Sequence, residues 1–183
     1  DAPERYVYLK TIFRDQDFIF AVPQAPYPVH SGTFVGYSWY LHGTEKAEMA
    51  VEMAALYVAS TVRAIQKKYN ITETTAIGFS QGASYSIIMG VKYHRLFDRV
   101  CAFGGWIDPS IVTDEDLEKV ESLEVFIAHG RDDKVCAYSG AISAVELLEK
   151  HDIEVVFESF DGGHKIDRET LVKAETWLLR QDD

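Results

Sequence analysis

Cysteine is scarce in this sequence, which has only Cys101 and Cys136 among its 183 residues. A disulfide framework needs several cysteines and a structural zinc site needs closely spaced ones, so both classes of protein are disfavoured. Cys101 lies in an apolar run, which indicates a core residue. Two cysteines far apart in the chain favour a reducing compartment, and we expect a cytoplasmic location.

Long apolar stretches and basic charge are lacking too. No stretch of about 18 apolar residues, the length that indicates a membrane-spanning helix, occurs in the sequence. Lys and Arg number 18 against 29 Asp and Glu, which gives a formal net charge of -11. A surface of this sign repels the phosphate backbone, so nucleic acid is not an expected partner.

Short apolar runs alternate with longer amphipathic stretches along the chain. The runs predict strands at 18–22, 74–79, 98–103, 124–128 and 153–157, and the stretches predict helices at 44–69, 81–93, 138–150 and 167–180. The segment 23–43, rich in Pro, Gly and aromatic residues, is expected to form a loop. This alternation predicts a single α/β domain over 1–183, with a mostly parallel sheet covered by helices on both faces.

In such a sheet the C-terminal ends of the strands lie along one edge, where open α/β sheets bind their ligands. The segment 78–82, Gly-Phe-Ser-Gln-Gly, follows the predicted strand 74–79 and opens the next helix. A nucleophile elbow has this G-x-S-x-G pattern in this context, which makes Ser80 the candidate nucleophile. In such an elbow the residues at 78 and 82 have to be small so that strand and helix can pass closely, which Gly78 and Gly82 satisfy. A plain tight turn with an exposed serine is the alternative.

A serine nucleophile needs a base, and His164 is the best placed of the six histidines. It follows the strand 153–157 and stands directly after Gly162 and Gly163, which let the chain turn inward. His129 closes the strand 124–128 and is expected to support the turn that follows it.

The loop after the strand 124–128 supplies two candidate acids, Asp132 and Asp133, in the chain order Ser, Asp, His that α/β-hydrolases use. Spacing alone leaves the choice between them open. A metal site built from these carboxylates with His129 and His164 is the competing interpretation, but no metal-binding spacing supports it.

These motifs resemble the phospholipase/carboxylesterase group of α/β-hydrolases, which includes the acyl-protein thioesterases. The resemblance runs from about Phe18 to the C-terminus and rests on the segments 21–26, 39–40, 78–83, 104–106, 129–135 and 163–164. It implies that Asp133 is the triad acid and that the backbone N–H of Gln81 is one oxyanion donor. It also places Trp39 and Tyr40 beside the site as substrate-binding residues.

Trp106 follows the predicted strand 98–103 and is expected at the same edge of the sheet. With Trp39 and Tyr40 it is a candidate for an acyl or alcohol pocket. The alternative is that these three aromatic side chains pack the loops together.

A second oxyanion donor is missing from the pattern. In the related family it comes from an H-G-x-G loop after a strand that precedes 18–22, and no such pattern occurs before Phe18. Residues 6–13 fit one face of a helix, although a strand is also compatible. We therefore expect that the chain is N-terminally incomplete and lacks one or more N-terminal strands of the hydrolase sheet.

The predicted function is that of a serine carboxylesterase for short- to medium-chain esters, with a small-molecule ester as partner. No cofactor and no metal are required. An acyl-protein thioesterase or lysophospholipase would use the same triad and is the alternative among enzymes. A catalytically silent α/β-hydrolase fold that serves as a binding module is the alternative of another class, and the intact triad argues against it. A homodimer is left open.

Overall fold

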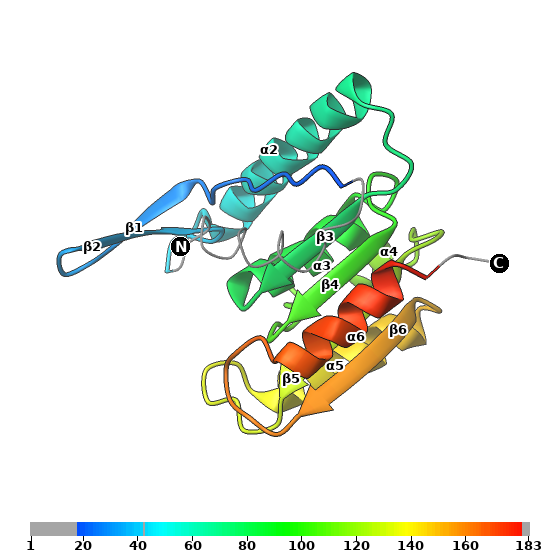
Figure 1. Cartoon of the computed structure of the whole chain (residues 1–183). Helices are drawn as coiled ribbons and strands as arrows, with labels where there is room; N and C mark the ends of the chain where they lie inside the picture. The colour runs from blue at the N-terminus through cyan, green and yellow to red at the C-terminus, as the bar shows by residue number, and fades with distance from the viewer. Residues whose placement is uncertain (1–17, 42, 181–183) are drawn as a thin grey trace.

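The central sheet has four parallel strands in the computed structural model, which describes residues 18–41 and 43–180 (Figure 1). Their order is β3-β4-β5-β6, with bounds Thr75–Phe79, Arg99–Phe103, Glu124–Gly130 and Glu154–Phe160. All three neighbouring pairs are parallel. The α/β architecture with a parallel sheet is therefore confirmed.

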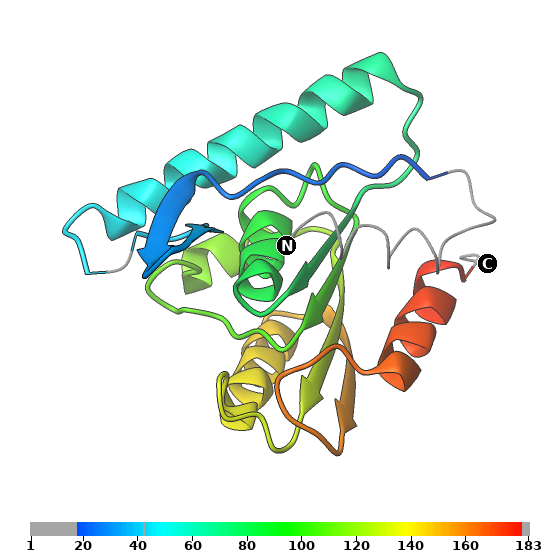
Figure 2. The same cartoon turned by 60° about the vertical axis from the view of Figure 1, so that its left-hand side comes forward.

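Helices cover both faces of this sheet (Figures 1 and 2). One face carries α2 (Ala47–Lys68), α3 (Gln81–Lys92), the short α4 (Asp114–Leu117) and α5 (Tyr138–Lys150). The opposite face carries α6 (Arg168–Leu178). Among the described residues no helix is both long enough and apolar enough to cross a membrane.

Alternate residues of the middle strands pack on opposite faces because successive side chains in a strand point in opposite directions. Val100 of β4 and Ile127 of β5 belong to the larger core, which includes residues of α2, α3 and α5. Their neighbours Cys101 and Phe126 pack with α6, where the Phe126 and Trp177 ring centroids lie 5.7 Å apart. Burial on both faces explains why residues 100–103 and 125–128 of these strands are all apolar.

Part of the segment expected to be a loop is a β-hairpin. It consists of β1 (Tyr27–Ser31) and β2 (Phe34–Ser38), which pair antiparallel. Gly32, with φ 60, is the first of the two residues that connect the strands. A two-residue connection with glycine in its first position matches the backbone twist of a hairpin.

The strand predicted at 18–22 is wrong. These residues have no regular secondary structure, and Phe18, Ile19 and Val22 are about half exposed. An apolar run becomes a strand only where a neighbouring backbone completes its hydrogen bonds. In the described part of the chain β3 pairs with β4 alone, and 18–22 does not join its other edge. The segment 6–13, predicted as a helix or a strand, lies outside the described residues.

Candidate active site

Ser80 stands between β3 and α3 in a strained conformation, with φ 57 and ψ -124. A positive φ costs a non-glycine residue free energy and persists where the surrounding structure enforces it. Here the Ser80 N–H donates to the Phe103 carbonyl oxygen of β4 over 2.8 Å. The turn has the strand, strained serine and helix of a nucleophile elbow.

The two glycines of the elbow differ in what they do. A Cβ at Gly78 would collide with the Gly82 carbonyl group and with the Ala83 backbone nitrogen, so a side chain cannot fit there. A Cβ at Gly82 would meet nothing within 4 Å. The expectation that Gly82 must be small for close packing is therefore wrong, and Gly78 alone allows the close approach.

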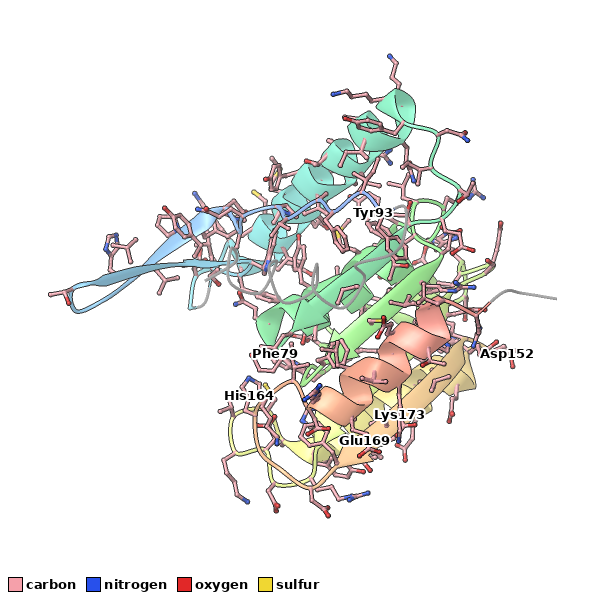
Figure 3. All side chains as sticks on the ribbon, in the orientation of Figure 1. Phe79, Tyr93, Asp152, His164, Glu169 and Lys173 are labelled. Atoms are coloured by element: carbon pink, nitrogen blue, oxygen red, sulfur yellow. The ribbon has the colours of Figure 1, made fainter. Side chains whose placement is uncertain are left out.

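Hydrogen bonds join the three residues predicted as a triad. His164 Nε2 lies 2.8 Å from Ser80 Oγ, and His164 Nδ1 lies 2.7 Å from Asp133 Oδ2. Figure 3 shows His164 beside Phe79, the last residue of β3, at one end of the sheet, with Asp152 at the opposite end. The Phe79 ring lies 4.7 Å from the imidazole between centroids and packs against it.

The Asp133 carboxylate accepts two hydrogen bonds besides the one from His164. Its Oδ1 accepts from the backbone N–H groups of Val135 and Cys136, each over 2.8 Å. Burial acts to raise the pKa of Asp133, but these two N–H donors and His164 lower it below its ordinary value. Asp132 is exposed, and it is Asp133 that contacts His164.

The loops that carry the acid and the histidine touch through their backbones. β5 and β6 stay in register as far as the pair Gly130 and Phe160. Beyond this pair the Asp132 N–H donates to the Gly162 carbonyl oxygen over 2.9 Å. A Cβ at Gly130 would collide with the carbonyl oxygens of Gly162 and Gly163. Glycine at 130 therefore brings Asp133 and His164 within hydrogen-bond distance.

His129 is fully buried beside Asp133. Its Nε2 lies 2.8 Å from the Cys136 carbonyl oxygen and 3.4 Å from Asp133 Oδ2. The carbonyl oxygen is an acceptor, so this ring nitrogen carries the proton. His129 thus fastens the 130–136 turn, in agreement with the role that the sequence indicates.

Cys136 lies beside Ser80, a neighbour that the sequence pattern does not indicate. Burial and the Asp133 carboxylate raise the pKa of the Cys136 thiol, and the Ser80 hydroxyl opposes this shift. Its place three residues after Asp133 is the signal that the sequence offers. The thiol is a neutral neighbour of Ser80.

The aromatic residues proposed for substrate binding pack around α3. The Trp39 ring stacks on Tyr85 with centroids 4.6 Å apart, and the Tyr40 ring meets Tyr85 edge-on at 6.0 Å. Burial, with Asp108 nearby, raises the pKa of Tyr40. The backbone N–H of Trp106 donates to Ser84 Oγ over 3.0 Å. The ring contacts of Trp39 and Tyr40 are those of the loop-packing alternative, and substrate contact of all three residues stays a prediction.

The metal alternative finds no support in this geometry. His129 Nε2 lies against the Cys136 carbonyl oxygen, and His164 Nε2 lies against Ser80 Oγ. Within 18–41 and 43–180 no three His, Cys, Asp or Glu side chains gather in a metal-binding arrangement.

A parallel sheet with helices on both faces and a strained serine elbow defines an α/β-hydrolase. Residues 8–180 match the model of the Phospholipase/Carboxylesterase family. The chain belongs to this family and is a hydrolase of the carboxylesterase and phospholipase type.

Two kinds of relative illustrate the match. A probable SOBER1-like carboxylesterase of Arabidopsis thaliana is 26% identical over 189 residues, which cover 94% of this chain and 72% of the relative. The crystal structure of esterase PE8 has a TM-score of 0.79 and 26% identity, covering 97% of this chain and 86% of the other. Acyl-protein thioesterase 2 of Zea mays shares the fold, with a TM-score of 0.73 at 16% identity over 94% of this chain and 86% of the other.

Proposed function

We propose that the protein is a serine carboxylesterase that hydrolyses short- to medium-chain carboxylic esters through Ser80, His164 and Asp133. The observation that carries the proposal is an unbroken chain of two hydrogen bonds. Ser80 Oγ lies 2.8 Å from His164 Nε2, and His164 Nδ1 lies 2.7 Å from Asp133 Oδ2. Family membership supplies the class of substrate.

In the acylation step Ser80 Oγ attacks the ester carbonyl carbon while its proton passes to His164 Nε2. His164 Nδ1 donates to Asp133, which holds the ring in this tautomer and stabilises the imidazolium that forms. The lowered pKa of Asp133 keeps its carboxylate ionised for this task. The imidazolium then protonates the leaving alcohol, and water releases the acyl group by the reverse path.

The tetrahedral intermediate needs donors for its oxyanion. Gln81 is the first residue of α3, and the N–H groups of the first helical turn have no acceptor within the helix. Its N–H follows the nucleophile directly in the chain. This N–H is therefore the oxyanion donor that the proposal assigns.

The preference for short and medium acyl chains rests on the segment between β4 and β5. Its one helix is α4, four residues long, with three acidic residues and the buried Leu117. A long apolar insertion that could cover a long acyl chain does not occur in the sequence of this segment.

A thioesterase or lysophospholipase activity is the second candidate, because the same triad would cleave an acyl thioester. The fold shared with the maize acyl-protein thioesterase favours testing it.

Both cysteines are free and buried, which supports our expectation of a reducing, cytoplasmic compartment.

The deciding experiment compares para-nitrophenyl esters, acyl thioesters and lysophospholipid of matched acyl lengths. A fluorophosphonate titration counts reactive Ser80, with Ser80→Ala as the blank. Faster turnover of short esters than of thioesters or lysophospholipid supports the carboxylesterase. Absence of Ser80-dependent turnover on every substrate would overturn it in favour of a binding module.

A further inference from the structure

The Gln81 side chain reaches across to the end of the β-hairpin. Its Oε1 accepts from the backbone N–H of Trp39 over 2.9 Å, and its Nε2 donates to Ser38 Oγ over 2.8 Å. These partners lie 42 and 43 residues earlier in the chain. Both ends of one amide group are thus engaged by the segment that leaves β2.

The Ser38 hydroxyl is fully used by this arrangement. It donates to the Tyr40 carbonyl oxygen over 2.8 Å and accepts from the Tyr40 N–H over 3.1 Å as well as from Gln81. A hydroxyl has one donor and two acceptor positions, so none remains. Ser38 is only 5% exposed, and water cannot readily replace a lost partner.

The start of α3 lacks the usual stabilisation. Ser80 occupies the N-cap position but makes no side-chain cap hydrogen bond, because its hydroxyl is directed to His164. Helix ends fray when their first turn is not capped. The nucleophile cannot both cap the helix and react, so the first turn needs another attachment. The Gln81 amide provides one.

We propose that the Gln81 side chain, held by Ser38 and the Trp39 N–H, is a positioning residue that fixes the first turn of α3 and so aims the Gln81 N–H at the oxyanion. This inference rests on the proposed esterase function. The side chain acts through its own backbone, whose N–H touches the reacting carbonyl oxygen. Its loss therefore weakens an interaction that is strongest in the transition state.

The hairpin end keeps a second attachment when the amide contacts are lost. The Trp39 and Tyr40 rings both pack against Tyr85, one turn further along α3 than Gln81. A variant that removes only the amide contacts therefore keeps the aromatic packing and is expected to fold. This separates positioning from folding in a test.

The test uses Gln81→Met, which keeps the length of the side chain, Ser38→Ala, and the double variant. The control is Ser86→Ala, because Ser86 is a buried serine of the same helix whose hydroxyl donates within α3, to the Gly82 carbonyl oxygen. Turnover of a short para-nitrophenyl ester is expressed per Ser80 that a fluorophosphonate titrates.

Gln81→Met removes both amide contacts and is expected to lower kcat about tenfold with KM little changed. Ser38→Ala removes only the contact with Nε2 and should lower kcat by a smaller factor. The double variant should fall no further than Gln81→Met, since the contact with Ser38 is already lost there. An aryl trifluoromethyl ketone serves as the inhibitor. Ser80 Oγ adds to its carbonyl carbon, the hydroxyl proton passes to His164, and the adduct carries a tetrahedral oxyanion. The inhibition constant of the ketone should rise by the same factor as kcat falls, while Ser86→Ala leaves both unchanged.

Native kcat in Gln81→Met, or losses in the two single variants that multiply in the double one, would overturn the inference. So would a loss of kcat without any change in inhibition by the ketone, because the oxyanion donor would then be intact. In each case Ser80-dependent turnover by the unaltered protein would still stand, so the proposed esterase function is judged separately.

Discussion

Gly130 and Gly162 touch backbone to backbone, and this contact joins the loop of the acid to the loop of the histidine. The contact leaves no room for a Cβ at 130. Across it the Asp132 N–H donates to the Gly162 carbonyl oxygen. The separation of Asp133 and His164 therefore depends on a residue that takes no part in the chemistry.

Gly130→Ala is expected to lower the free energy of unfolding by about 1–3 kcal/mol, because the two loops must move apart to admit the methyl group. Turnover should fall as well, since the hydrogen bond from His164 to Asp133 lengthens. Gly163→Ala is the control, because its Cβ would meet only the Asp132 carbonyl oxygen, at 3.8 Å. Urea unfolding gives the free energy of unfolding of both variants. Equal values for Gly130→Ala and Gly163→Ala would contradict the close contact at Gly130.

Ser80→Ala and His164→Ala should each reduce kcat by about 10⁴- to 10⁶-fold, because the members of a triad act as a unit. Circular dichroism should show an intact fold, since the Ser80 and His164 side chains are partly exposed. Initial rates on a short ester, with active sites counted by fluorophosphonate, give the measurement. Near-native turnover in either variant would refute the assignment.

Asp133→Asn should reduce kcat by about 10⁴-fold, whereas Asp132→Asn should change it little. An amide at 133 cannot stabilise the imidazolium and favours the wrong tautomer of His164. Asp132 is exposed and contributes its backbone N–H to the loop contact, which the substitution leaves in place. The same ester assay compares the two, and a greater loss at 132 would move the acid to that residue.

The lowered pKa of Asp133 predicts how stability depends on pH. Because the pKa is lower in the folded chain than in the unfolded one, the unfolded state binds more protons between the two values. The stabilisation is complete above the ordinary carboxyl pKa of about 3.9 and is lost as pH falls through the folded value. Unfolding free energies measured across this window should rise less steeply with pH in Asp133→Asn. Parallel curves would contradict the lowered pKa.

The sequence indicates the sheet and its edge well because both depend on local patterns. The apolar runs of β4 and β5 are buried on both faces, so they show in the sequence without any knowledge of their neighbours. The elbow follows from the spacing of Gly78 and Ser80 after a strand. The prediction of Asp133 over Asp132 as the acid rests on the family resemblance, because two adjacent aspartates share every local signal.

Other features depend on contacts between distant residues. The run at 18–22 has the composition of a strand, but composition does not say whether a partner backbone is present. The Gly32 turn of the hairpin was a local signal that the many aromatic and proline residues around it obscured. The Gln81 amide meets Ser38 from 43 residues away, and no pattern in one sequence predicts such a pairing.

The acyl-length preference gives the last prediction. Residues 108–122, between β4 and β5, are mostly acidic and polar and contain one four-residue helix, α4. We expect a long acyl chain to leave most of its methylenes in water there. Each methylene that stays hydrated adds nothing to binding, whereas a buried one contributes about 0.8 kcal/mol. We therefore expect kcat/KM for para-nitrophenyl esters to rise over the short acyl lengths and then level off. The rate should not rise abruptly when a substrate passes its solubility limit. The reason is that the segment between β4 and β5 contains no long apolar stretch that an oil–water interface could displace. The measurement is a series of acyl lengths in monomeric solution and in emulsion, with Ser80→Ala as the blank. A steep gain for long triglycerides in emulsion would contradict the prediction and favour a lipase-like substrate.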